Sequence, residues 1–474
     1  METLEIALLL VALAGLSGVI VQFVPVLPLP LVQIALGAGL ASLGTGLHIT
    51  FSPEVFLLLF IPPLLFADAW RVPKRELFRL RWPVLTLAVG LVVFTIAGVG
   101  YFVHWEIPGV PLSSACVLAA VLSPTDAVAV QALSGHIKIP TRLMHILEGE
   151  ALLNDASALV ALKFAVAATL VGQFSPLAAS GSFVLVAGGG LVVGAALAWL
   201  FGRLRDKLVE LHGEQPASQI VLFVLLLPFA AYLAAEAVHC SGILAAVAAG
   251  MTLNFTDLDR GDHSTTRMHS RTIWNILGFV LNGIIFVLLG FQLPGIYGGD
   301  LRQKAFDSIP GGNWELFEYA AAILAALLVL RFVWIYCASH IAALITRWRG
   351  EEKYECPPWR VMGAGALAGI RGAITLAAAL SVPLLMPDGK PFPARDMIVF
   401  QATTVILLSL VVGCIGLPLL LRGVSMPEED ESGDREEREA RIQAAEAGMR
   451  ALEKAQQEHE SSSHADDPDY RRYR

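Results

Sequence analysis

Long apolar segments without charged residues recur along this chain and limit what it can fold into. One of them covers residues 183–201 and contains no charged side chain. About 20 apolar residues in a helix are enough to cross the hydrocarbon core of a bilayer. The composition agrees, because 55% of the residues are apolar and 16% are charged, against about 25% charged in soluble domains. These features exclude a soluble enzyme, a nucleic-acid-binding protein and a disordered chain.

The spacing of the apolar segments predicts an all-α polytopic membrane protein with about thirteen membrane-spanning helices. Only helices and closed barrels satisfy their backbone polar groups in lipid, and no alternating strand pattern appears. The first segment has no basic stretch before it, so we expect a retained helix and not a cleaved signal peptide. The predicted helices are 5–23, 27–46, 53–69, 83–103, 112–132, 145–171, 179–202, 217–238, 241–255, 273–292, 317–346, 361–386 and 398–422.

Basic residues gather in alternate loops of this prediction. Because cytoplasmic loops carry an excess of Lys and Arg, we expect the N-terminus outside and the C-terminal tail in the cytoplasm of a multi-pass plasma-membrane protein. The opposite loops hold only Arg302, Lys304, Lys390 and Arg395. The basic residues of the predicted cytoplasmic loops are Arg71, Lys74, Arg75, Arg79, Arg81, Lys138, Arg142, Arg203, Arg205, Lys207, Arg260, Arg267, Arg271, Arg347, Arg349, Lys353 and Arg360.

Two of the predicted helices contain helix-breaking sequence at matching positions. The fifth contains Ser-Pro-Thr-Asp at 123–126 and the twelfth has four glycines within 363–372. Proline and glycine both interrupt helices. Thirteen helices can be divided into two halves of six joined by one linking helix, which is the number expected for an inverted repeat. In such transporters, a pair of interrupted helices at matching positions indicates an ion site near the membrane midplane. A kink at Pro124 and close packing at the glycines are the structural alternatives.

Ionisable residues within the predicted helices are the second functional indication, because they are costly in a membrane and usually functional. The sixth helix contains Glu148, Glu150, Asp155 and Lys163, and the fifth contains Asp126. Arg331 and Arg371 lie in the eleventh and twelfth helices. Asp68, Glu236 and Glu318 lie near predicted helix ends, where we expect solvation.

Asp155 is the buried acid without an evident counter-charge. If Glu150 pairs with an arginine, that pair is electrically silent, and breaking it would cost about 3–5 kcal/mol. Burial favours the protonated form of a carboxyl group, whereas a bound cation or a helix N-terminus favours the carboxylate. Asp155 can therefore hold a proton or a metal cation, and this competition predicts an exchanger.

Three segments resemble the cation/proton antiporter-1 family of sodium/proton antiporters. They are Leu147–Ala156 (LEGEALLNDA), Ser123–Val130 (SPTDAVAV) and Ala368–Ile374 (AGIRGAI). Ser241–Ala245 and Ile61–Phe66 also fit, and the likeness runs from about Leu8 to Leu421. The resemblance implies a homodimer in contact with lipid, with a scaffold and a mobile six-helix core that work by elevator-like alternating access.

The resemblance also implies electroneutral exchange of one Na⁺, or Li⁺ or K⁺, for one H⁺ in pH homeostasis, with no further cofactor. Asp155 would bind the cation and the proton, and Asn154, Asp126 and Thr125 would shape the site. Glu150 would pair with Arg331, and Arg371 would sit where the broken helices cross.

This sequence departs from the family pattern at two positions. Ala151 stands where many relatives have serine, and Ala67, followed by Asp68, stands where others have an acid. Both changes remove candidate ligands, so the preference among Na⁺, Li⁺ and K⁺ does not transfer. A K⁺/H⁺ antiporter and an uncoupled cation channel stay open as alternatives. An intramembrane protease does not fit, because a rhomboid-like enzyme needs Gly-x-Ser-Gly and position 239 is His.

The composition changes at residue 426, which predicts a transporter domain at 1–425 and a charged cytoplasmic tail at 426–474. Acidic residues 428–431 precede a segment, 435–460, rich in Glu, Arg, Ala and Gln. Such a segment favours a solvated helix with charge pairs four residues apart. It contains no glycine-rich nucleotide fingerprint, and its sequence identifies no partner.

Overall fold

The computed structural model describes most of the chain and divides it into two units. The units are Met1–Arg422 and Gly423–Arg474. In the second unit, residues 442–454 form a helix whose side chains are exposed. The described residues are 2–24, 27–43, 58–72, 74–134, 139–171, 176–212, 217–256, 264–298, 314–349, 356–422, 438–439 and 442–454. Residues 53–57 of the predicted third helix and the loop residues Lys138, Arg260, Arg302, Lys304 and Lys353 lie outside them.

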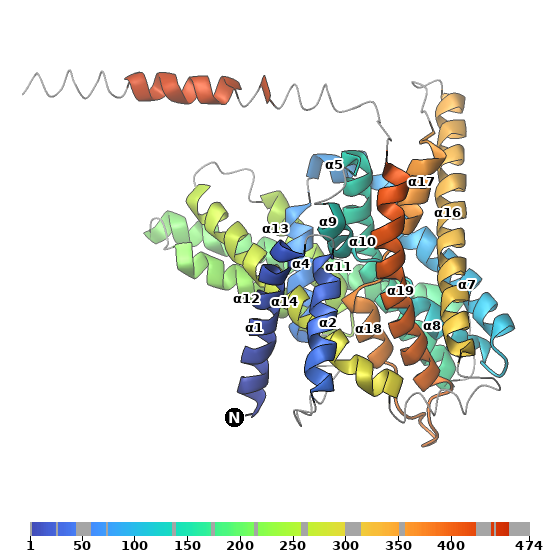
Figure 1. Ribbon diagram of the computed structural model, residues 1–474. Coiled ribbons are helices and arrows are strands. Elements are labelled where there is room, and N and C mark those ends of the chain that lie inside the picture. The colour runs from blue at the N-terminus through green and yellow to red at the C-terminus, as the bar shows by residue number, and fades with distance from the viewer. Residues whose placement is uncertain are drawn as a thin grey trace, which may run out of the picture. The chain divides into compact units, whose positions relative to one another are not determined.

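The first unit is built almost entirely from helices (Figure 1). Within the described residues there is no β-strand, and the β-bridge between Leu385 and Pro391 is isolated. The elements are α1 Glu2–Phe23, α2 Leu29–Ser42, α4 Ile61–Arg71, α5 Lys74–Arg79, α6 Arg81–Leu85, the π-helix η1 Thr86–Leu91, α7 Val92–Glu106, α8 Leu112–Val121, α9 Ala127–Ser134, α10 Thr141–Val171, α11 Pro176–His212, α12 Ala217–Ala237, α13 Gly242–Thr256, α14 Ser264–Gly298, α16 Glu315–Arg349, α17 Trp359–Leu367, α18 Ala373–Leu380 and α19 Arg395–Leu421.

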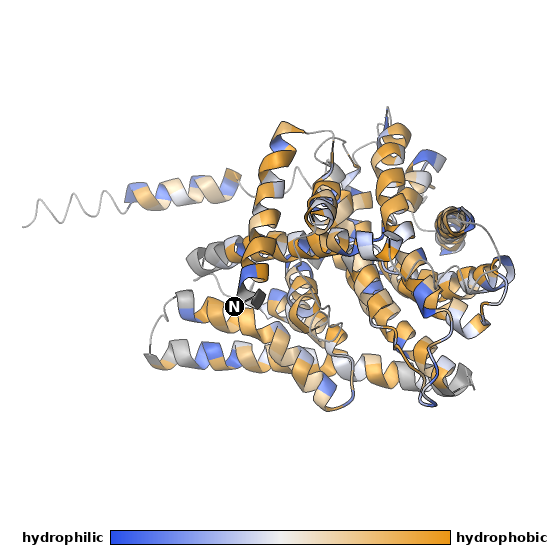
Figure 2. Cartoon of the chain, turned by 60° about the horizontal axis from the view of Figure 1, so that its bottom comes forward, coloured by the Kyte–Doolittle hydropathy of each residue, from blue (hydrophilic) through white to orange (hydrophobic). Residues whose placement is uncertain are grey.

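Hydrophobic residues dominate these helices along their length (Figure 2). Among the described residues, eight helices are long and apolar enough to cross a membrane. Three shorter apolar helices, α2, α8 and α13, join them. The prediction of an all-helical membrane protein is therefore confirmed.

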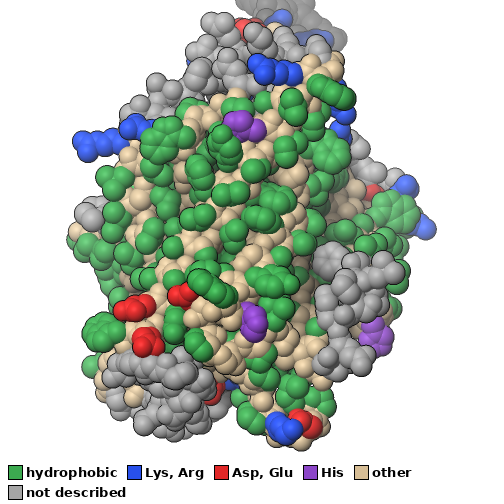
Figure 3. Space-filling model, turned by 90° about the vertical axis from the view of Figure 1, so that its right-hand side faces the viewer, with side chains coloured by type: hydrophobic (Ala, Val, Ile, Leu, Met, Phe, Trp, Pro, Cys, Tyr) green, Lys and Arg blue, Asp and Glu red, His purple; other side chains and the backbone are tan. Residues whose placement is uncertain are grey.

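The face of the molecule seen in Figure 3 is largely apolar, as lipid contact requires. In Figure 3, hydrophobic side chains cover the middle of one face and most of the charged side chains lie toward its ends. On α16 the exposed side chains include Val329, Val333 and Ile341. Trp314 lies beside the start of this helix and Trp348 near its end, and they are 77% and 91% exposed. Tryptophan favours the membrane–water interface, so these two residues fit the two edges of the bilayer.

The helices pack into two bundles. In the first bundle α14 lies along α2 and α1, and α13 packs against α11, α12 and α4. In the second, α8 packs against α7 and α10, and α19 packs against α16, α17 and α18. The bundles meet where α10 touches α4, α11 and α13, and where α14 touches α18. This contact surface holds the site described below.

Glycines bring helices together differently in the two bundles. In the first bundle, a Cβ added at Gly37, Gly194 or Gly290 would overlap the backbone carbonyl of Val287, Ala245 or Ile34. In the second bundle, a Cβ at Gly98, Gly413 or Gly416 would instead meet the ends of the Leu330, Ile370 and Leu367 side chains. Small residues let helix backbones approach closely in membranes. At these glycines, the neighbouring group is backbone in the first bundle and a movable side chain in the second bundle.

This difference predicts unequal costs for two glycine-to-alanine substitutions. Gly290→Ala drives a methyl group into the Ile34 carbonyl, so the helices must separate, and we expect a loss of about 1–3 kcal/mol or more. Gly416→Ala places its methyl 2.6 Å from Leu367 Cδ1, which can rotate away, so we expect a change below about 1 kcal/mol. Thermal unfolding in one detergent measures both, and equal melting temperatures for the two variants would contradict the prediction.

Candidate functional site

The first interruption lies between α8 and α9. Helix α8 ends at Val121, residues 123–126 have no regular secondary structure, and α9 begins at Ala127. Pro124 disfavours helical backbone in the residue before it. Asp126 then caps α9, because its Oδ1 accepts hydrogen bonds from the backbone N–H groups of Val128 (2.9 Å) and Ala129 (3.1 Å).

The second interruption, between α17 and α18, touches the first. Helix α17 ends at Leu367 and α18 begins at Ala373. The Asp126 N–H donates to the Ile370 carbonyl oxygen over 2.8 Å. A Cβ at Gly372, the residue before α18, would overlap the Asp126 carboxylate. Asp126 therefore lies at the N-terminal ends of two half-helices, where the helix dipoles favour negative charge.

Arg371 lies at the opposite ends of these broken helices and is 2% exposed. Its Nε donates to the Leu122 carbonyl at the end of α8, over 3.0 Å. Its Nη1 donates to the Gly369 carbonyl just beyond α17. Helix C-terminal ends favour positive charge. The guanidinium thus offsets the ends of α8 and α17, while Asp126 offsets the starts of α9 and α18.

Glu150 and Arg331 form a fully buried ion pair between α10 and α16. Arg331 Nη2 donates to Glu150 Oε2 over 2.6 Å, and Nη1 donates to Oε1. Arg331 Nε donates to the Gly365 carbonyl of α17 over 2.9 Å. Bidentate geometry with a third hydrogen bond is what makes a buried pair tolerable. The pair adds no net charge and joins three helices.

Asn154 and Asp155 are adjacent on α10, and their side chains lie in different surroundings. Asn154 Nδ2 donates to the Ser123 carbonyl (3.1 Å) and to Thr125 Oγ1 (3.3 Å), so it ties α10 to the first interruption. Asp155 is 6% exposed. Among the described residues, its Oδ1 is buried without a hydrogen-bond partner. An unsatisfied buried oxygen is expensive, so Asp155 Oδ1, like the equally unpartnered Asn154 Oδ1 next to it in the chain, is available to a ligand.

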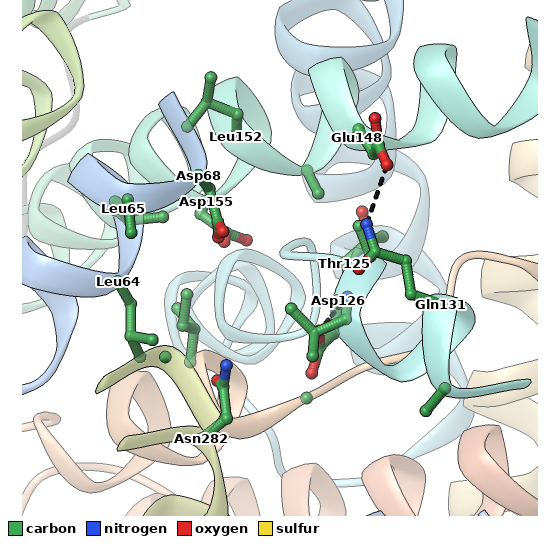
Figure 4. A pocket seen from close by; sticks show the side chains of 18 of the residues that line it. Leu64, Leu65, Asp68, Thr125, Asp126, Gln131, Glu148, Leu152, Asp155 and Asn282 are labelled. Atoms are coloured by element: carbon green, nitrogen blue, oxygen red, sulfur yellow. Dashed lines mark hydrogen bonds between the residues drawn. The ribbon is translucent and has the colours of Figure 1, made fainter. Parts of the chain in front are cut away.

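Asp155 borders a cavity of about 490 Å³ at the contact between the bundles. Thr125, Asp126 and Ala151 border it from the second bundle, and Leu64, Leu65 and Asn282 from the first. Figure 4 shows Asp155, Asp126 and Thr125 around this space. The structure thus gathers three of the residues singled out in the sequence at one cavity, with Asn154 bonded to Thr125 behind it. Glu150, Arg331 and Arg371 do not line it.

Two further acids border the cavity, and the sequence analysis gave neither a role in the site. Glu148 accepts a hydrogen bond from Gln131 Nε2 over 2.9 Å. The side chain of Asp68 is 41% exposed, and it borders the same cavity as Asp155. Its position two residues after the Ile61–Phe66 motif was the available signal in the sequence. Hydropathy placed Asp68 at a solvated helix end, whereas the structure places it on the wall of the cavity.

Lys163 and Glu236, outside the cavity, are paired. Lys163 Nζ lies 3.1 Å from Glu236 Oε1, and that oxygen also accepts a hydrogen bond from the Gly242 N–H over 3.2 Å. Glu236 therefore has specific partners, whereas the sequence suggested only solvation.

The site can attract a cation but does not form a closed metal cage. Asp68, Asp126, Glu148 and Asp155 face one cavity with a single arginine, Arg71, on its wall. Oxygen ligands suit hard cations. No group of three His, Cys, Asp or Glu side chains with metal-binding geometry occurs among the described residues.

Comparison with known proteins places the chain among ion exchangers. The family model "Sodium/hydrogen exchanger, transmembrane" matches residues 7–423. The chain is 45% identical over 462 residues to the uncharacterised Na⁺/H⁺ exchanger YjcE of Escherichia coli, covering 96% of this chain and 83% of that protein. It is 44% identical over 424 residues to a sodium, potassium, lithium and rubidium/H⁺ antiporter of Bacillus pumilus, covering 89% of this chain but 61% of that longer protein.

The fold is also that of a solved antiporter. The sodium proton antiporter MjNhaP1 of Methanocaldococcus jannaschii at pH 8 matches with a TM-score of 0.64 and 18% sequence identity. The match covers 89% of this chain and 99% of that one. At this identity the likeness concerns the arrangement of the helices.

Proposed function

The chain belongs to the sodium/hydrogen exchanger family, and from this premise we propose that it exchanges an alkali cation, Na⁺ first, for H⁺ at Asp155. One observation carries the proposal. Among the described buried charges, Glu150, Arg331, Asp126 and Arg371 have ionic, capping or carbonyl partners, whereas Asp155 has an unpartnered oxygen beside the cavity.

Exchange follows from the charge of this carboxyl group. Empty Asp155 is negative, and moving a net charge through the membrane interior is expensive. A bound proton and a bound monovalent cation each neutralise it. The loaded protein can therefore change its access from one side to the other, and the empty protein cannot. One proton leaves for each cation that enters, so the exchange is electroneutral.

Cation choice is the finer part of the proposal. The Bacillus relative is named for sodium, potassium, lithium and rubidium, and Ala151 supplies no hydroxyl to the cavity. We propose Na⁺ as the principal cargo with K⁺ and Li⁺ as competitors. The site that Asn154, Thr125 and Asp126 shape around Asp155 would bind the cation, with no other cofactor.

The movement that we propose is an elevator. The first bundle would be the scaffold and the dimer interface, and the second bundle would be the mobile core. The two interruptions would be equivalent parts of an inverted repeat of thirteen spans. Residues 1–425 would form the transporter in the plasma membrane, with the N-terminus outside and the charged tail, 426–474, in the cytoplasm. This assignment is supported by the dense packing within each bundle and the site at their contact.

Purified protein in liposomes tests the proposal. An inward Na⁺ gradient should alkalinise the lumen with no dependence on a clamped voltage. Because protons compete for Asp155, the apparent KM for Na⁺ should rise as the pH falls, by up to about tenfold per pH unit. A current without proton movement would establish the channel alternative, and a KM for Na⁺ independent of pH would refute the competition. Repeating the assay with K⁺ and Li⁺ ranks the cargoes.

A further inference from the structure

Asp68 and Arg71 are the charged residues on the wall of the cavity that the first bundle provides. They are three residues apart on α4 and therefore share a face of that helix. Arg71 Nη1 lies 3.9 Å from Asp68 Oδ1, and the two side chains are 37% and 41% exposed. Both border the cavity together with Asp155, and Figure 4 draws Asp68 beside it.

From this placement we propose that Asp68 and Arg71 are an affinity-setting pair for the transported cation. Asp68 draws the cation toward Asp155, and Arg71 opposes it with a fixed positive charge. The inference rests on the proposed function and goes beyond it, because neither residue belongs to the site on α10. It assigns cation affinity to the bundle opposite Asp155.

Arg71 is held in place independently of Asp68. Its Nη2 donates to the Trp274 carbonyl of α14 over 2.7 Å, and a Cβ at Gly278 would lie 3.5 Å from the same atom. Its contact with Asp68, at 3.9 Å, is longer than a hydrogen bond. The guanidinium is therefore anchored to the first bundle, and Asp68 is only partly neutralised and can turn toward a cation.

The charges that face this pair are acidic. Asp155, Asp126 and Glu148 border the same cavity, with His145. Asp68 borders the cavity with these acids and lies 3.9 Å from Arg71. Removing Asp68 lowers the attraction for a cation, and removing Arg71 raises it. A role limited to holding α4 in place would instead predict the same direction of change for both variants.

The test is the steady-state KM for Na⁺ of Asp68→Asn, Arg71→Gln and the double variant in liposomes. Half-exposed charge pairs alter an equilibrium by up to about fivefold. We therefore expect Asp68→Asn to raise KM about three- to fivefold and Arg71→Gln to lower it by a similar factor. The double variant should return to within about twofold of the parent, and the maximal rate should change by less than about twofold throughout.

Conservative and distant variants provide the controls. Asp68→Glu and Arg71→Lys keep the charges and should keep KM near that of the parent. Asp388 and Lys390 form an exposed pair of the same type, 3.2 Å apart, away from the cavity, and Asp388→Asn and Lys390→Gln should leave KM unchanged. If KM shifts in the same direction for Asp68→Asn and Arg71→Gln, the proposed role of the pair is refuted. It is also refuted if the variants lose maximal rate while KM stays constant. If the unaltered protein exchanges no cation for protons, it is the proposed function that fails.

Discussion

Replacing Asp155 by asparagine is expected to abolish cation-driven proton movement while the protein still folds. Asp155 is 6% exposed, and among the described residues one of its oxygens has no partner and the carboxylate is in no ion pair. Asparagine has almost the same shape but can neither release a proton nor neutralise a cation. Lumenal pH in liposomes under a Na⁺ gradient should match that of empty vesicles.

The comparison variant for this experiment is Asp388→Asn, which removes an equally negative but exposed acid. It should exchange normally. Gel filtration and thermal unfolding of Asp155→Asn should resemble those of the parent, because a buried unpaired acid contributes little to stability. Exchange at the parental rate in Asp155→Asn would refute the assignment of this residue.

The second large effect is expected for Glu150→Gln, and it is an effect on stability. Removing this carboxylate leaves the buried Arg331 guanidinium without its counter-charge, which costs about 3–5 kcal/mol. The cost should exceed that of Asp155→Asn, because Asp155 has no such partner. Melting temperatures in detergent measure the difference, and equal values for the two variants would count against a structural role for the pair.

A double replacement separates the charge effect from lost packing. Glu150→Leu combined with Arg331→Met removes both charges, and such replacements of buried pairs are often neutral or stabilising. In this protein part of the stability recovered by removing both charges should be lost again, because the Gly365 carbonyl loses its hydrogen-bond donor, Arg331 Nε. We expect the double variant to melt well above Glu150→Gln. A double variant that melts below the single one would contradict the electrostatic explanation.

Much of the helical framework could be predicted from the sequence, because the bilayer imposes length and hydrophobicity on each segment. The breaks near Pro124 and among the glycines of 363–372 were visible as local chemistry, and the structure has non-helical residues at both places. The ends of the helices were harder to predict from the sequence. Helix α10 begins at Thr141 and α16 ends at Arg349, several residues beyond the predicted bounds, because polar turns can extend a helix into the interface.

The lining of the cavity could be predicted from the sequence only in part. Hydropathy gives the depth of a residue along a helix but not the neighbour that it faces. Asp68 and Arg71 looked like a solvated helix end and a loop charge, and only the packing of α4 against α10 and α14 brings them to Asp155. The roles of Asp155, Asn154, Asp126 and Thr125 stay predictions. The structure contributes the arrangement that makes each of them testable.

The glycine contacts of the first bundle bear on how this protein could be re-engineered. Where a glycine contacts the backbone carbonyl of a neighbouring helix, as Gly290 contacts Ile34, there is no space for a larger residue. Where the neighbour is a leucine or isoleucine tip, as at Gly413 and Gly416, repacking can accommodate it. A library designed to alter cargo choice therefore has most room where α19 faces the end of α17, and least where α2 faces α14 and where α11 faces α13.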